Sequence, residues 1–218
     1  MMDDLRSRVE GEEFDHLILL DCLKRYGRPR DKITVLLRKK AIIRVKKGIY
    51  IFGPKYARRP FSREVLANMI YGPSCVSLDF ALHRHGMIPE RVEAVTSVTP
   101  GRGRRFATPV GLFLYRRVPP ASFPIGVDQV RLEGGRSFLM AVPEKALADK
   151  IQDDRGTAIR GREEMRQYLA QSLRIDAESL EDLSAERVGI LAGRYGSRKL
   201  RLLESVLARL RQEGGAHK

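Results

Sequence analysis

Few residues of this sequence are of a type and spacing that could perform metal or acid–base chemistry. His83 and His85 are two positions apart, so on a helix their side chains would point about 200° apart and could not share a metal ion. A carboxylate cluster for a divalent metal could be assembled only from Asp149, Asp153 and Asp154, which leaves a metal-dependent nuclease as an open alternative. The sequence favours a protein that is not an enzyme and that binds no metal or other cofactor.

The other candidate motifs are incomplete. The glycine- and arginine-rich segment 101–105 lacks the Gly-Lys-Ser/Thr ending of a phosphate-binding loop and is predicted to be a flexible basic loop. No Gly-x-Ser-x-Gly motif or Cys–His nucleophile pair is visible. Cys22 and Cys75 are too few for a disulfide framework or a four-cysteine zinc site, and we expect both to be buried.

Cationic residues are more informative because they are concentrated in one segment. The chain has 218 residues, with 41 Lys and Arg against 27 Asp and Glu, for a net charge of +14. Residues 24–59 contain 14 of the basic residues and one acidic residue, Asp31, so this window carries nearly the whole net charge. A run of charge can simply be a solvated face, but a strongly basic chain makes nucleic acid the first partner to consider.

Two helices are predicted to position these cations. Apolar residues recur at helical spacing over residues 14–26, from Phe14 through Leu17 and Ile18 to Leu23, and Gly27 would end this helix. Asp31 could cap a second helix that runs to about Lys40. Its inward face would comprise Ile33, Leu36, Leu37 and the stem of Lys40. Its outward face would be basic.

Residues 41–52 follow as two short β-strands joined by a turn at Gly48. The order helix, turn, basic helix, basic hairpin is that of a winged helix-turn-helix, in which the second helix enters a DNA groove. The predicted groove contacts are Lys32, Thr34, Val35, Arg38 and Lys39. The predicted phosphate contacts are Arg28, Arg30, Arg44, Lys46 and Lys47. RNA remains open as the ligand, because phosphate contacts do not distinguish it from DNA.

The fold class predicted for the whole chain is α+β. Residues 1–58 would form the winged helix DNA-binding domain and, after a Pro- and Gly-bounded linker, residues 59–218 a second domain. The second domain would begin as a small mixed α/β unit with helices at 62–71 and 78–86 and from Pro143. Its strands would include residues 92–99, 126–131 and 137–141, and residues 106–115 would form a turn and a strand.

From about residue 156 the chain is predicted to be helical, with helices over 162–173, 180–195 and 198–213. The apolar stripe on these helices would be a core, and it leaves a homodimer open. No apolar run approaches the length of a membrane span, and the start of the chain is acidic where a signal peptide is basic. We therefore expect a cytoplasmic protein without a membrane partner.

Several short motifs, in this order and spacing, resemble those of the AbiEi family of antitoxins. They are Ile43–Tyr50, Ser77–Leu82, His85–Glu90, Val95–Thr99, Phe106–Gly111 and Ala141–Asp149. The resemblance covers about residues 14–155, and the helical tail is less distinctive. One departure concerns the first domain: only Arg28, Pro29 and Arg30 separate the two predicted helices, so the middle helix of a winged helix would be very short or missing.

The resemblance implies two functions on two domains. The winged helix would bind inverted repeats in the promoter of its own operon and repress it. The second domain would neutralise a nucleotidyltransferase-like toxin, either by direct binding or without a stable complex. A winged-helix transcriptional regulator without a toxin partner and an RNA-binding protein remain the alternatives.

Overall fold

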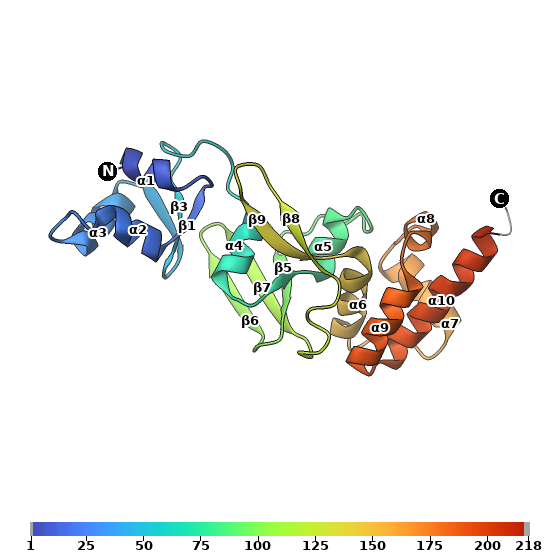
Figure 1. The fold of residues 1–218 in the computed structure, drawn as a ribbon. Helices are drawn as coiled ribbons and strands as arrows, with labels where there is room; N and C mark the ends of the chain where they lie inside the picture. Colours follow the sequence, from blue (N-terminus) through green and yellow to red (C-terminus); the bar gives the residue numbers. More distant parts are fainter. Residues whose placement is uncertain (1, 216–218) are drawn as a thin grey trace.

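The computed structural model describes residues 2–215, and its side chains through residue 212. Three parts follow one another along the long axis of the molecule: an N-terminal unit, a central sheet with helices on both faces, and a group of C-terminal helices (Figure 1). Helices and strands occur in both sheet-containing parts, so the predicted α+β class is confirmed. No helix within residues 2–215 is both long and apolar enough to cross a bilayer.

The N-terminal unit combines three helices with a three-stranded antiparallel sheet. Its elements are α1 (Met2–Arg8), β1 (Glu13–Asp15), α2 (His16–Leu23), α3 (Pro29–Arg38), β2 (Ile42–Lys46) and β3 (Ile49–Phe52). The strand order is β1-β3-β2. The predicted hairpin is therefore present, and a short strand preceding α2 pairs with its second strand.

The start of α2 differs from the prediction. Phe14 lies in β1 opposite Tyr50, not on the helix, and Asp15 caps α2 by accepting a hydrogen bond from the backbone N–H of Ile18 at 2.9 Å. The helix therefore turns a different face inward: Leu19, Cys22 and Leu23 are buried. Leu17, expected in the core, is 74% exposed.

α1 was not anticipated from the sequence, and it changes the arrangement of helices. With α1 in front, α2 is the second of three helices in the unit, and no helix lies between α2 and α3. α1 contributes Met2 and Leu5 to the hydrophobic core of the unit. No helical period can be recognised in its seven residues, because only two of them, Met2 and Leu5, are apolar.

The central part is a six-stranded mixed sheet in the order β6-β7-β5-β4-β9-β8. Its strands are β4 (Cys75–Val76), β5 (Val95–Thr99), β6 (Arg104–Thr108), β7 (Gly111–Arg117), β8 (Val127–Arg131) and β9 (Ser137–Ala141). The pairs β5–β7 and β4–β9 are parallel, and the other neighbours are antiparallel. β6 begins at Arg104, so the end of the predicted basic loop belongs to a strand.

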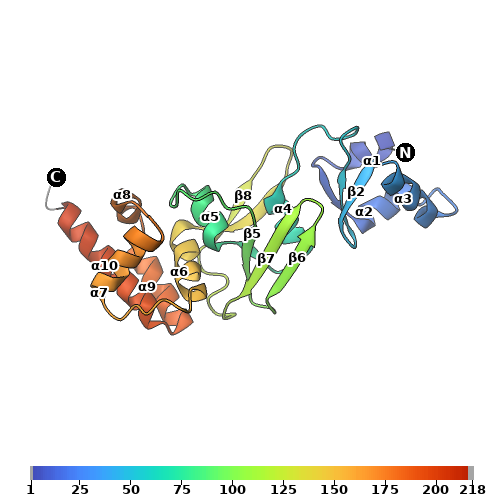
Figure 2. The same ribbon diagram turned by 180° about the vertical axis from the view of Figure 1, so that it is seen from behind.

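Three helices complete the central part. α4 (Arg63–Ile70) covers one face of the sheet, and α5 (Leu78–Arg84) and α6 (Pro143–Asp153) cover the other (Figures 1 and 2). Ser62 caps α4, as expected, by accepting from the N–H of Val65 at 3.2 Å. The strand β5 is buried along its whole length because both faces are covered.

The C-terminal helices are α7 (Arg162–Gln167), a π-helical turn (Tyr168–Ser172), α8 (Ala177–Glu181), α9 (Ala185–Tyr195) and α10 (Arg198–Gly215). The single helix expected over 180–195 is therefore divided. Ser184 divides it, because its side chain caps the new helix α9 by accepting from the N–H of Arg187. Gly196 then ends α9 in the left-handed conformation that favours glycine, which lets α10 turn back.

Candidate nucleic-acid interface

α3 carries the cations at the centre of the prediction, and local sequence sets its orientation. Pro29 occupies its first turn, where a missing N–H costs nothing, so the helix begins before Asp31 and this residue lies in the first turn instead of capping it. Ile33 and Leu36 are buried against the rest of the unit. The opposite side of the helix is therefore held toward solvent.

The outward face of α3 presents two adjacent rows of side chains. Arg30, Thr34 and Arg38 are spaced four residues apart and share one row, and all three are exposed. Exposed Lys32 and Lys39 flank half-buried Val35 in the next row. The hydroxyl of Thr34 donates to the carbonyl of Arg30 at 3.1 Å, and Lys32 lies 5.1 Å from the centre of the Tyr26 ring.

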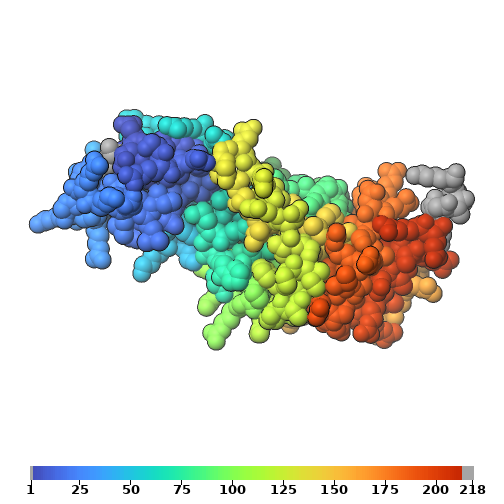
Figure 3. Space-filling model, viewed as in Figure 1, coloured from blue at the N-terminus to red at the C-terminus, as the bar shows by residue number. Residues whose placement is uncertain are grey.

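Exposed cations also surround α3. Arg28 lies at its start, and Arg44 and Lys47 lie on the β2–β3 hairpin. Among the side chains of residues 2–212, no carboxylate pairs with any of the predicted contact cations, which are Arg28, Arg30, Lys32, Arg38, Lys39, Arg44, Lys46 and Lys47. Long side chains project from this unit in the space-filling view (Figure 3). The positive charge of the surface is thus uncompensated.

Lys46 is the exception among the predicted contacts. Its ammonium donates a 2.7 Å hydrogen bond to the carbonyl of Ile70 at the end of α4 and lies 4.3 Å from the centre of the Phe106 ring on β6. Its side chain therefore fastens the hairpin to the central sheet. Since a phosphate contact would require breaking both interactions, we leave Lys46 out of the candidate interface.

The hairpin also shares a hydrophobic core with the central part. Val45, Ile49 and Ile51 belong to the same buried cluster as the sheet residues. The N-terminal unit contacts the central part along the face seen in Figure 3. The cations of the N-terminal unit are consequently carried on a body docked to the rest of the chain.

Two adjacent buried glutamates form a second connection between the N-terminal unit and the rest of the chain. The sequence analysis did not identify them. Glu12 is buried, pairs with Arg6 at 2.8 Å, and accepts from the backbone N–H groups of Arg58 and Arg59 in the linker. Glu13 accepts from the N–H of Ser62 and pairs with Arg136 at 3.3 Å. No local signal marks these glutamates, because all of these partners except Arg6 are distant in sequence.

The three aspartates considered for a metal site have other partners. Asp149 is fully buried, 3.3 Å from the ammonium of Lys145. Asp153 pairs with Arg116 at 3.1 Å, and Asp154 pairs with Lys150 at 3.1 Å. Across residues 2–215 no group of three or more His, Cys, Asp or Glu side chains is arranged to hold a metal ion.

The Asp149 carboxylate is the centre of a buried polar cluster. It accepts from the hydroxyl of Ser77 at 2.6 Å and from the hydroxyl of Tyr195 on α9. Burial raises the pKa of Asp149, although Lys145 and the hydroxyl donors act in the opposite direction. Burial and the Asp149 carboxylate together raise the pKa of Tyr195. The cluster joins α6, the start of α5 and the C-terminal helices.

The candidate interface is thus the exposed basic face of α3 with Arg28, Arg44 and Lys47 beside it. Its chemistry is suited to anionic oxygen atoms and to the acceptor edges of bases. No protein-family model matches this chain, and no curated protein matches it either.

Proposed function

We propose that the N-terminal unit is a winged helix-turn-helix and that the protein binds duplex DNA through it. The observation that carries this proposal is the placement of α3: it follows α2 after a tight turn, buries its apolar face, and presents an uncompensated basic face beside a basic hairpin. A helix held in this way fits the major groove, and the adjoining hairpin can contact the sugar–phosphate backbone.

In this proposal the two sets of cations have different tasks. Lys32, Arg38 and Lys39, with Thr34 and Val35 between them, face the floor of the groove, where Arg and Lys recognise guanine and a methyl-bearing side chain meets thymine. Arg28, Arg30, Arg44 and Lys47 contact phosphates and position the helix.

We further propose that the protein is an antitoxin that represses its own operon. This part rests on the resemblance to AbiEi antitoxins in motifs that lie in the hairpin and in the strands, helices and loops of the central part. The toxin would be a nucleotidyltransferase-like protein encoded beside it. The basic surface does not contribute to this part of the proposal, because the motifs that suggest an antitoxin lie mainly outside α3.

Binding to the protein's own upstream DNA tests the first part. Affinity for this duplex is compared with that for a random duplex and a matched RNA over a salt series. If the four predicted phosphate contacts are made, affinity falls about 10²-fold between roughly 50 and 200 mM salt. Selective binding to the upstream duplex supports the proposal, whereas equal binding to every duplex or a preference for RNA contradicts it.

Coexpression with the adjacent gene product tests the second part. The intact chain should relieve growth arrest by a neighbouring nucleotidyltransferase-type protein. The full-length Arg38→Ala variant should lose repression of the upstream promoter but still relieve the arrest, because Arg38 lies on α3, far from the C-terminal helices (Figure 1). Failure of the intact chain to relieve the arrest would leave a transcriptional regulator without antitoxin activity.

A further inference from the structure

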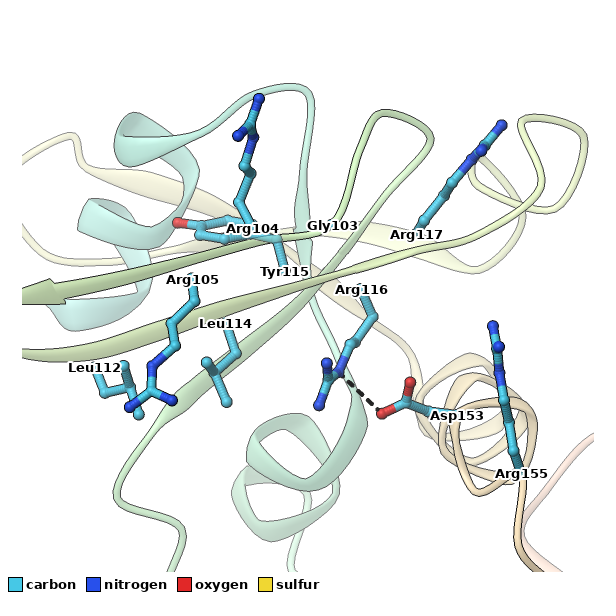
Figure 4. Close-up of a pocket in the computed structure, with 10 residues that line it drawn as sticks. All are labelled: Gly103, Arg104, Arg105, Leu112, Leu114, Tyr115, Arg116, Arg117, Asp153 and Arg155. Carbon is cyan, nitrogen blue, oxygen red and sulfur yellow. Dashed lines mark ion pairs between the residues drawn. The ribbon is translucent and has the colours of Figure 1, made fainter.

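An arginine-rich hollow lies over the β6–β7 strand pair, away from the candidate DNA interface. Its volume is about 800 Å³. Five arginines contribute to its wall: Arg104, Arg105, Arg116, Arg117 and Arg155. Figure 4 shows the side chain of Arg105 on the same side of the strands as that of Arg116, and Arg155 projecting from the chain just after α6.

Most of these cations have no partner in the structure. Arg116 pairs with Asp153. The side chains of the other four, Arg104, Arg105, Arg117 and Arg155, are exposed and make no ion pair or side-chain hydrogen bond with the described side chains of residues 2–212. Arg104 and Arg117 project on the opposite side of the strands from Arg105 and Arg116 (Figure 4). The uncompensated guanidinium groups on the side of Arg116 are therefore those of Arg105 and Arg155, and they indicate an anionic partner.

The floor of the hollow is apolar. Leu112 and Leu114 on β7 lie on one face of the sheet and are only half-buried, and Figure 4 shows both on the same side of β7 as Arg116. No exposed aromatic ring lies beside them to stack on a nucleic-acid base, since Tyr115 is buried and its hydroxyl donates to the carbonyl of Ala67. Leucines surrounded by arginines suit an acidic protein surface that also carries an apolar side chain.

The same chain carries such a surface on its C-terminal helices. Residues 176–186 contain five acidic residues and no basic one, although the chain as a whole is strongly basic. The five are Asp176, Glu178, Glu181, Asp182 and Glu186, and all are exposed without an ion pair within residues 2–215. Ile190 is 49% exposed on α9, four residues after Glu186 and therefore on the same side of that helix.

We propose that the arginine-rich hollow of one molecule binds the acidic surface at residues 176–190 of a second copy. Arg187, the one basic residue within that range, is paired with Glu144 at 3.0 Å. Opposite charges would surround an apolar contact between Ile190 and the two leucines, which is the usual arrangement of a protein–protein interface. α6 lies between the β6–β7 pair and α8 in both ribbon views, so the two surfaces of one molecule do not meet (Figures 1 and 2). The contact is therefore intermolecular and joins copies head to tail.

Charge reversal at the two surfaces tests this association. One variant carries Arg105→Glu and Arg155→Glu, and the other carries Glu181→Lys and Asp182→Lys. All four positions are exposed, so the variants should retain the fold, which circular dichroism checks. Self-association is measured by sedimentation velocity at about 50 and about 500 mM salt, between which the screening length shrinks roughly threefold.

We expect the wild-type protein to associate at low salt and to dissociate at high salt. Each variant alone should associate at least about tenfold more weakly, because like charges then face each other. An equimolar mixture of the two variants should associate again, because the hollow of each variant is then opposite in charge to the surface of the other variant. Duplex affinity should be unchanged in the arginine variant, since its substitutions lie outside the N-terminal unit.

Three results would overturn the proposal. The first is a wild-type protein that stays monomeric at low salt. The second is an unaltered association in either single variant, or a mixture that remains dissociated. The third is a loss of duplex or RNA affinity in the arginine variant with association unchanged, which would assign the hollow to nucleic acid instead.

Discussion

Lys46 and Lys47 are neighbours in the sequence with different surroundings, and they form a matched pair for experiment. Lys47 is exposed near the hairpin turn, whereas the Lys46 ammonium is held by the Ile70 carbonyl and the Phe106 ring. We expect Lys47→Ala to weaken binding to all duplexes alike and to reduce the salt slope by about one. Lys46→Ala should leave the slope unchanged and lower the free energy of unfolding by about 1–3 kcal/mol. Equal salt slopes in the two variants would contradict this assignment.

The buried pair Lys145–Asp149 predicts a large stability effect. Lys145→Met removes the ammonium that compensates Asp149 inside the protein, and breaking a buried pair typically costs about 3–5 kcal/mol. Urea unfolding measures this loss. As a control, Arg91→Met breaks a pair with Glu93 whose side chains are mostly exposed, and it should change stability by less than about 0.5 kcal/mol. A Lys145→Met variant that is as stable as the control would contradict a stabilising role for the buried pair.

At the scale of elements, the sequence predicted what depends on local pattern. The α3 helix, the hairpin, helices α4 to α6 and the strands β5, β7, β8 and β9 follow from apolar period, capping residues and turn residues. The strand β6 was not predicted, because its residues were interpreted as a loop and a turn. Leu17 was misplaced because the pairing of Phe14 with Tyr50, a long-range contact, sets where α2 begins. For the same reason the sheet order and the docking of Lys46 could not be predicted from a local pattern.

Gly53, which follows β3, tests the packing of the N-terminal unit. A Cβ atom there would lie 1.8 Å from the carbonyl oxygen of Lys40, a backbone atom that cannot move aside alone. We expect Gly53→Ala to destabilise the unit by about 1–3 kcal/mol or more. Gly27→Ala is the control, because a Cβ at Gly27 meets nothing within 4 Å. Equal melting temperatures of the two variants in differential scanning calorimetry would contradict the close approach of Gly53 to the Lys40 carbonyl.

On the scale of the whole molecule, two connections hold the N-terminal unit against the central sheet. One is the hairpin contact through Lys46 and the apolar residues beside it. The other is the pair of buried glutamates, Glu12 and Glu13, which accept from linker N–H groups and from arginines. The linker is thus bound along part of its length, and we expect the two parts to move as one body.

Limited trypsin digestion tests this docking, because the linker contains Lys55, Arg58 and Arg59. Glu12→Ala removes the acceptor for two linker N–H groups and the ion-pair partner of Arg6. Because local opening of the linker then becomes easier, cleavage in the linker should accelerate at least about tenfold. Asp3→Ala, at an exposed residue of α1, should cleave at the wild-type rate. Rapid linker cleavage in the wild type would contradict a docked linker.

The central claim is that the outer face of α3 reads DNA sequence, and selection from a randomised duplex pool tests it most directly. The wild-type protein should enrich one motif. The Arg38→Ala variant should enrich the same motif, but with its preference lost at one or two adjacent base pairs. This loss is expected because a good bidentate contact to a base contributes about 1–3 kcal/mol of discrimination. Lys47→Ala should enrich the unaltered motif. An Arg38→Ala motif identical to that of the wild type, or no motif from either protein, would contradict recognition by α3.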